Sequence, residues 1–163
     1  MDSKSCNHVF PSNSLRLRVL VVRIDRMSTW LLKTEPSTYS FADLVGDKKA
    51  TWDGVANPTA LQNLRAMKKG DTLIIYHTGS EKAAVGLAKV IRAAYPDPKQ
   101  SDPKLVVIDL APDRPLAHPV TLAQIKGDKR FAGWDLLRIG RLSVVPTSDA
   151  QLAAILQLAA QPH

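Results

Sequence analysis

The sequence predicts an α+β fold, in which about five or six mostly antiparallel strands form a small barrel-like sheet with short helices at its periphery. Three observations lead to this prediction. The apolar runs have the length of strands, these runs do not alternate regularly with long helices, and turn residues separate neighbouring runs closely enough for hairpins. A doubly wound parallel sheet needs regular alternation and is not expected.

The strands are expected where apolar residues recur between turn signals. Proline at position 36 ends the first strand, the GSEK turn joins two strands into a hairpin, and proline at position 146 ends the last. The proline-rich segments 95–104 and 112–119 are expected to be loops. The predicted strands are residues 29–33, 71–78, 83–93, 105–111 and 141–146, with one more short strand within 48–58.

The helices are predicted from their N-terminal capping residues. Ser40 can cap a short helix with Asp43 three residues on, and Asn57, followed by proline, opens a helix that ends at the KKG segment. Ser148 and Gln151 form a capping box at the start of the final helix. The other segments expected to be helical or irregular are residues 121–127 and 129–140.

The chain length of 163 residues fits one domain, and we place that domain at residues 28–161. Residues 1–27 are polar at first and then alternate basic and apolar residues, so we interpret them as a non-native or disordered extension. A targeting segment is the alternative; the apolar stretch VLVV is too short for a signal peptide, but an Arg-rich leader stays open.

The composition excludes several classes of protein. No apolar run is long enough to span a bilayer, and Cys6 is the single cysteine, so there is no internal disulfide framework. We therefore expect a soluble, cytoplasmic protein without a membrane partner, most simply a monomer. Residues 28–163 carry 17 Lys and Arg against 13 Asp and Glu, a net charge of +4, which mildly favours an anionic partner such as nucleic acid.

No catalytic signature is present in the sequence. It has neither a glycine-rich phosphate loop nor a nucleophile elbow, and its 4 histidines show no metal-ligand spacing. We therefore predict no metal site, no cofactor and no enzymatic activity. A hydrolase that uses His77 with Asp53 or Glu35 remains an alternative.

Polar residues mark the end of the first predicted strand. Lys33, Thr34 and Glu35 precede a chain-turning proline, and side chains at a strand end project from the rim of a barrel. Lys33 could contact a phosphate, and Thr34 and Glu35 could hydrogen bond the edge of a base. A surface ion pair between Lys33 and Glu35 is the simpler interpretation.

Three aromatic positions are candidates for a binding site. Trp52 lies beside Asp53 in a glycine-containing loop, where an indole can stack on a base, although it could equally anchor the loop in the core. Tyr76 and His77 are neighbours on a strand, so their side chains should point to opposite faces unless a bulge intervenes. A core histidine whose ring is hydrogen bonded is the alternative for His77.

Several fragments, in this order, resemble the EVE domain family, a branch of the PUA-like fold. They are WLLKTEP, WDGVANP, LRAMKKGDTLIIYHTGSEKAAVG, AYPD and RLSVVP, which span Trp30 to Pro146. The first 27 residues lie outside the resemblance.

The resemblance implies a pseudo-barrel with a pocket near the end of the first strand. The family is thought to bind modified bases in DNA or RNA, notably modified cytosines, and has no established catalysis. Trp52 then matches the wall of an aromatic cage and Asp53 an edge-reading group. The full set of implied pocket residues is Lys33, Thr34, Glu35, Trp52, Asp53, Asn57, Tyr76 and His77.

One departure from the family concerns the loop after Trp52. The family commonly has arginine where this chain has Ala56, so a phosphate-contacting or loop-bracing group is missing. Replacement charge is expected from Arg65, Lys68, Lys69 and Arg141. We predict a non-catalytic reader of a modified base in nucleic acid, with a nucleoside or metabolite sensor, or a small nucleotide hydrolase, as alternatives.

Overall fold

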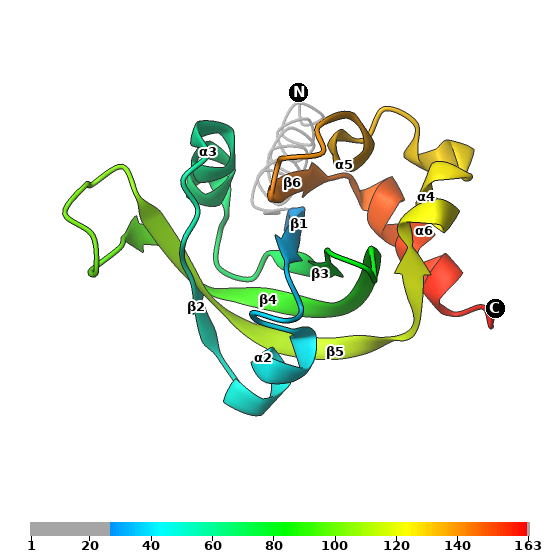
Figure 1. Ribbon diagram of the computed structural model, residues 1–163, viewed down its shortest axis with the longest axis horizontal. Coiled ribbons are helices and arrows are strands. Elements are labelled where there is room, and N and C mark those ends of the chain that lie inside the picture. The colour runs from blue at the N-terminus through cyan, green and yellow to red at the C-terminus, as the bar shows by residue number, and fades with distance from the viewer. Residues whose placement is uncertain (1–26, 163) are drawn as a thin grey trace, which may run out of the picture.

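The computed structural model describes residues 27–162, which form one curved sheet with short helices around it (Figure 1). The sheet has six strands in the order β2-β5-β4-β3-β1-β6. The strands are β1 (Thr29–Thr34), β2 (Ala50–Trp52), β3 (Thr72–His77), β4 (Ala83–Pro96), β5 (Val106–Thr121) and β6 (Val144–Thr147). The helices are α2 (Phe41–Asp47), α3 (Pro58–Ala66), α4 (Leu122–Lys126), η2 (Lys129–Phe131), α5 (Asp135–Arg138) and α6 (Asp149–Ala159). The α+β class predicted from the sequence is confirmed.

The strand pairing is antiparallel except between β1 and β3, which run parallel from Thr29↔Thr72 to Thr34↔His77. Residues 35–71 form the crossover between these two strands and include α2, β2 and α3. A parallel pair needs such a long crossover, whereas antiparallel neighbours need only a turn. This crossover is what carries β2 to the opposite edge of the sheet.

The sheet curls without closing. β2 and β6 are its two edge strands and are not paired with each other within residues 27–162. Helix α3 packs against β4, β5 and β6, and the Asn63 side-chain amide donates a 2.8 Å hydrogen bond to the Val144 carbonyl. The helix thus spans part of the opening between the edges and makes the sheet a pseudo-barrel.

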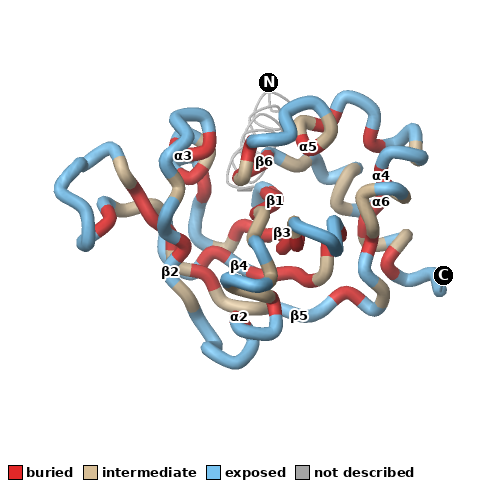
Figure 2. Tube along the Cα trace, in the orientation of Figure 1, coloured by how far each residue is buried: buried red, intermediate tan, exposed pale blue. Residues whose placement is uncertain are grey.

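The core lies inside this curl, along β1, β3 and β4 (Figure 2). Leu31 and Leu32 of β1 are both fully buried, as are Leu73 and Ile74 of β3, so these two central strands are covered on both faces. Strands that are buried on both faces have continuous apolar sequences, which is why their apolar runs were the clearest strand signals.

The three predicted caps are all present. Ser40 and Ser148 form capping boxes with Asp43 and Gln151, and the Asn57 side chain accepts hydrogen bonds from the backbone N–H groups of residues 59 and 60. The capping side chains occupy backbone donors that the first turn of each helix leaves unpaired.

Two sequence predictions about proline were wrong. Residues 112–119 are part of β5 rather than a loop, and Pro146 lies within β6 rather than at its end. β2 pairs only with residues 108–110, so the rest of β5 has a free edge, and β6 is itself an edge strand. On a free edge a proline removes no ladder hydrogen bond. The predicted extension, residues 1–27, lies outside the described residues except for Met27.

Candidate nucleic-acid interface

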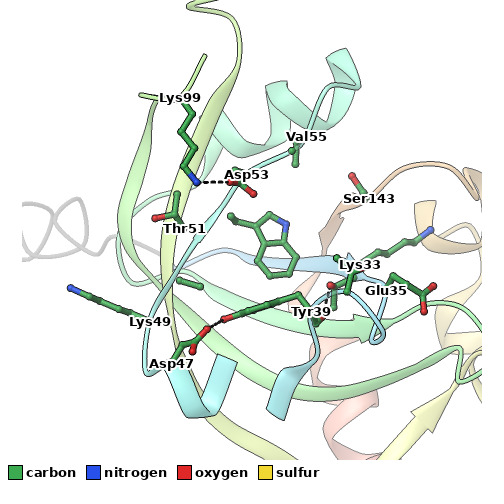
Figure 3. A pocket seen from close by; sticks show the side chains of 15 residues that line it. Lys33, Glu35, Tyr39, Asp47, Lys49, Thr51, Asp53, Val55, Lys99 and Ser143 are labelled. Carbon is green, nitrogen blue, oxygen red and sulfur yellow. Dashed lines mark hydrogen bonds and ion pairs between the residues drawn. The ribbon is translucent and has the colours of Figure 1, made fainter. Parts of the chain in front are cut away.

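A cavity of about 670 Å³ opens where the free edge of β2 faces the end of β1 (Figure 3). Its volume is typical of pockets that hold small organic molecules. It brings together five of the predicted pocket residues, namely Lys33, Thr34, Glu35, Trp52 and Asp53. The other lining residues are Thr38, Tyr39, Asp47, Lys49, Ala50, Thr51, Gly54, Val55, Lys99 and Ser143.

Trp52 is both a core residue and a wall of the cavity. It ends β2, where it pairs with Ile108, and the alternation of the strand turns Thr51 outward and Trp52 inward. The indole is 9% exposed and belongs to the hydrophobic core, yet it also lines the cavity. The core therefore anchors the Trp52 ring, while stacking of a base on it stays a prediction.

Tyr39 forms a second aromatic wall and was not predicted. Its ring meets the indole of Trp52 edge to face, with centroids 6.4 Å apart and an interplanar angle of 78°. Its hydroxyl donates a 2.8 Å hydrogen bond to Asp47 (Figure 3). Burial, together with the hydrogen bond to Asp47, raises the pKa of Tyr39 to about 12. The tyrosine is therefore neutral throughout the physiological pH range.

A tight turn after β1 positions Tyr39. The Glu35 carbonyl accepts 2.9 Å hydrogen bonds from the backbone N–H groups of Thr38 and Tyr39, and the Thr34 hydroxyl donates a 2.6 Å hydrogen bond to the Tyr39 carbonyl. The Thr34 hydroxyl thus stabilises the turn, and through the turn it positions Tyr39 at the cavity.

Lys33 and Glu35 line the cavity but bind other groups rather than each other. The Lys33 ammonium donates a 2.9 Å hydrogen bond to the Gly140 carbonyl, and partial burial lowers the pKa of this lysine. The Glu35 carboxylate accepts a 3.2 Å hydrogen bond from the Thr78 hydroxyl. In Figure 3 both charged groups lie across the cavity from Lys49.

Asp53 and Ser143 offer polar groups to a ligand. The only ion pair of Asp53 among residues 27–162 is a loose contact of 3.9 Å with Lys99, and both side chains are exposed. Within the same range the Ser143 hydroxyl has no hydrogen bond, although its carbonyl accepts one from the Lys33 backbone. The free edge of β2 also presents backbone groups to the cavity.

Asn57, Tyr76 and His77 do not line the cavity. Asn57 caps α3 instead. Tyr76 and His77 are both buried, at 4% and 7% exposure, because β3 is covered on both of its faces. The register shift opposite Ile75 and Tyr76 leaves the extra residue, Val85, on β4, so β3 keeps its regular alternation.

His77 acts on the site indirectly. Its Nε2 accepts a 3.0 Å hydrogen bond from the Phe41 backbone N–H, and its Nδ1 lies 2.8 Å from the Glu81 carboxylate. The ring therefore carries its proton on Nδ1 and accepts at Nε2. This contact ties the first residue of α2, two positions after Tyr39, to the end of β3.

The four predicted phosphate contacts lie away from the cavity lining. Arg65, Lys68, Lys69 and Arg141 are all exposed, and Arg65 donates a 2.7 Å hydrogen bond to the Lys104 carbonyl. The cations that line the cavity, besides Lys33, are Lys49 and Lys99. Lys49 lies just before β2 and Lys99 in the loop after β4.

No group of three or more His, Cys, Asp or Glu side chains among residues 27–162 could hold a metal ion. No helix in that part of the chain is long and apolar enough to cross a membrane.

Comparison with known proteins agrees with this geometry. Residues 28–158 match the sequence profile of the EVE domain. Human thymocyte nuclear protein 1 is 32% identical over 165 residues, which cover 80% of this chain and 73% of that protein.

The fold is also similar to those of solved protein structures. Rpa0253 from Rhodopseudomonas palustris is 36% identical, with a TM-score of 0.79 over 84% of this chain and 97% of that one. Human THYN1, solved in complex with DNA that contains 5-methylcytosine, is 27% identical, with a TM-score of 0.77 over 83% of this chain and 99% of that one. The chain belongs to the EVE domain family.

Proposed function

We propose that this protein is a non-catalytic DNA-binding domain that holds a modified cytosine, of the 5-methylcytosine kind, in the cavity beside Trp52. The observation that carries the proposal is the pair of aromatic walls, Trp52 and Tyr39, around a cavity of about 670 Å³ with a loosely paired carboxylate at its rim. The complex of human THYN1 with 5-methylcytosine DNA supports the choice of ligand.

The cavity can repay the cost of extruding a base from a duplex. Extrusion costs a few kcal/mol, and stacking a base on an aromatic ring returns about 1–3 kcal/mol. Hydrogen bonds to the base edge supply the rest. A carboxylate is a natural acceptor for the exocyclic amine of cytosine, and Asp53 is the candidate for that contact. The Val55 side chain, which also lines the cavity, gives a 5-methyl group an apolar neighbour.

The charged groups of the site support binding rather than turnover. Glu35 and Asp47 each accept a hydrogen bond from a hydroxyl group, and both ring nitrogens of His77 are engaged outside the cavity. A hydrolase that pairs His77 with Asp53 or Glu35 would need the imidazole in the cavity. The geometry does not offer that pairing.

The test compares binding by two tryptophan variants. Wild-type protein should bind oligonucleotides with one 5-methylcytosine more tightly than the same strands with cytosine, in both single-stranded and duplex form. Trp52→Ala should weaken binding about tenfold or more, because stacking is lost. Trp134→Ala is the control, since Trp134 is also a buried core residue but packs on Phe131 and does not line the cavity. Fluorescence anisotropy measures the dissociation constants, and circular dichroism checks that both variants fold.

Several outcomes would contradict the proposal. If neither strand bound at low salt, or if the two tryptophan variants lost the same affinity, the cavity would not be the binding site. Tighter binding of methylated RNA than of methylated DNA would show that RNA, rather than DNA, is the preferred ligand. A free nucleoside that raises the melting temperature when oligonucleotides do not would favour a metabolite sensor. Turnover of nucleotides that His77→Ala abolishes would favour a hydrolase.

A further inference from the structure

A second hollow, of about 390 Å³, lies beside the first and is lined by Lys49, Ala50, Thr51, Ile91, Arg92 and Asp109. Ala50 and Thr51 of β2, together with Lys49, line both hollows. A single strand therefore separates them, and the width of one strand is about 4.8 Å. A polynucleotide with one base in the first cavity would therefore place a neighbouring nucleotide in the second hollow if its backbone crossed β2.

A row of side chains across three strands builds this hollow. Asp109 of β5 is in register with Thr51 of β2 on one side and with Arg92 of β4 on the other. The Asp109 carboxylate accepts a 2.9 Å hydrogen bond from the Thr51 hydroxyl and a 2.6 Å hydrogen bond from the Tyr95 hydroxyl. The guanidinium carbon of Arg92 lies 3.7 Å from the centre of the Tyr95 ring.

These contacts hold the Arg92 guanidinium in place before any ligand arrives. Asp109 fixes the Tyr95 ring, and the ring supports the cation through a cation–π contact. A preorganised arginine loses less side-chain entropy on binding than a free one. Guanidinium planes stack on unpaired bases and also bind phosphate, so this group suits a nucleotide.

The charge and the apolar surface of the hollow also suit a nucleotide. Lys49 and Arg92 oppose the single carboxylate of Asp109, which leaves the lining with a net charge of +1. Ile91 is 37% exposed at this surface, an unusual exposure for isoleucine and a suitable contact for the flat face of a base or sugar.

We propose that the second hollow is a subsite for the nucleotide adjacent to the extruded base, with its phosphate at Lys49 and Arg92. The proposal rests on the proposed function, because it requires a base in the first cavity. It makes the ligand a polynucleotide rather than a free base, since a nucleoside reaches only the first cavity.

The test uses three ligands and matched single-charge variants. The ligands are a short single-stranded oligonucleotide with a central 5-methylcytosine, the same strand trimmed on one side of that base, and free 5-methyl-2′-deoxycytidine. The variants are Arg92→Gln and, as the control, Lys126→Gln, which removes a positive charge from exposed Lys126 of α4, at the opposite end of the molecule from β2 (Figure 1).

Arg92→Gln should bind the central oligonucleotide roughly fivefold to tenfold more weakly at low salt than Lys126→Gln does. The slope of log affinity against log salt should fall by about 0.7, the value for one phosphate contact on a single strand. Trimming the strand on one side should remove this difference between the variants. Binding of the free nucleoside should be the same for both variants.

The outcomes separate this proposal from the proposed function. If wild-type protein binds the methylated oligonucleotide and Arg92→Gln matches Lys126→Gln, the subsite is refuted while the base cavity stands. If Arg92→Gln weakens the free nucleoside as much as the oligonucleotide, Arg92 acts on the first cavity and the subsite is also refuted. If wild-type protein binds none of the ligands, both proposals fail.

Discussion

Tyr39 and Trp52 meet edge to face in the wall of the cavity, with ring centroids 6.4 Å apart. The two residues reach this position by different routes. A turn after β1 fixes Tyr39, and the pairing of the edge strand β2 with β5 fixes Trp52. The cavity therefore exists because the curl brings the edge strand β2 close to the end of β1, and its shape depends on the segments that fix each ring.

Tyr39 gives a prediction about pH. Burial and the hydrogen bond to Asp47 raise its pKa from 10.0 to about 12, so the folded state holds this proton more tightly than the unfolded state does. The stabilisation that results is complete below pH 10 and is lost as the pH rises through 12. Tyr39→Phe should lose less stability than wild type over that interval, as measured by urea unfolding.

The same variant separates the ring from its hydroxyl. Tyr39→Phe keeps the aromatic wall, so binding of a methylated oligonucleotide should stay within about threefold of wild type, because the edge-to-face contact needs only the ring. Asp47→Asn is the control for the pH effect and should lower the pKa of Tyr39 in an absorbance titration. If the titration of Tyr39 in Asp47→Asn matched that of wild type, this explanation would be contradicted.

His77 should stabilise the fold through its acceptor nitrogen. His77→Ala leaves the Phe41 N–H buried without its partner, and a buried unpaired donor costs about 1–3 kcal/mol in addition to the lost packing. His77→Gln can place an oxygen near the position of Nε2 and should recover part of the loss. Urea unfolding gives the free energies.

Glu81→Gln is the control for His77, because Glu81 is exposed and its contact with the ring should contribute at most about 1 kcal/mol. If His77→Gln were as unstable as His77→Ala, packing of the ring rather than the hydrogen bond to Phe41 would explain the effect.

The sequence was informative where structure is local. Ser40, Asn57 and Ser148 were predicted as caps because a capping side chain binds backbone only two or three residues away. The cluster of Lys33, Thr34 and Glu35 with Trp52 came from the family resemblance, and the cavity does contain them. No local pattern required these residues to meet.

The sequence was uninformative where position depends on distant segments. Tyr39 carries no motif, and its aromatic character one turn after a strand end was the only available signal. The burial of both Tyr76 and His77 depends on the segments that cover the two faces of β3. The proline-containing segment of β5 was predicted to be a loop. It can be a strand because β2 is short and pairs only with residues 108–110, which leaves the edge beside the prolines free.

Two glycines near the cavity should respond oppositely to alanine. A Cβ on Gly86 would lie 2.5 Å from the ring of Phe41, so Gly86→Ala must displace the first residue of α2 and should cost about 1–3 kcal/mol. A Cβ on Gly46, within α2, meets nothing within 4 Å. Gly46→Ala should stabilise the protein by up to about 1 kcal/mol, because alanine is the better helix former.

Thermal or urea unfolding of the two alanine variants checks this pair. The binding assay adds a second readout, since α2 follows the turn that holds Tyr39, and Gly86→Ala should also weaken binding of a methylated oligonucleotide. Equal stability of the two variants would show that Phe41 can move aside without cost.

Asp71 joins the start of β1 to the start of β3, the two strands that pair in parallel. Its carboxylate is 1% exposed and accepts hydrogen bonds from the backbone N–H groups of Ser28 and Lys68 and from the Trp30 indole, at 2.9–3.1 Å. Asp71→Ala leaves these donors unpaired at the junction of β1 and β3 and should cost about 3–5 kcal/mol.

Asp71→Asn tests whether acceptor geometry or charge matters more. An amide keeps one oxygen for the Trp30 indole and Lys68 but turns an NH₂ group toward the Ser28 N–H, so its loss should be about half that of alanine. Asp113→Asn, at an exposed position of β5, removes the same charge and should change the unfolding free energy by less than about 0.5 kcal/mol. If Asp71→Ala and Asp113→Asn were equally stable, the buried carboxylate would not hold β1 against β3. The position of Lys33, Thr34 and Glu35 at the cavity would then depend on strand pairing alone.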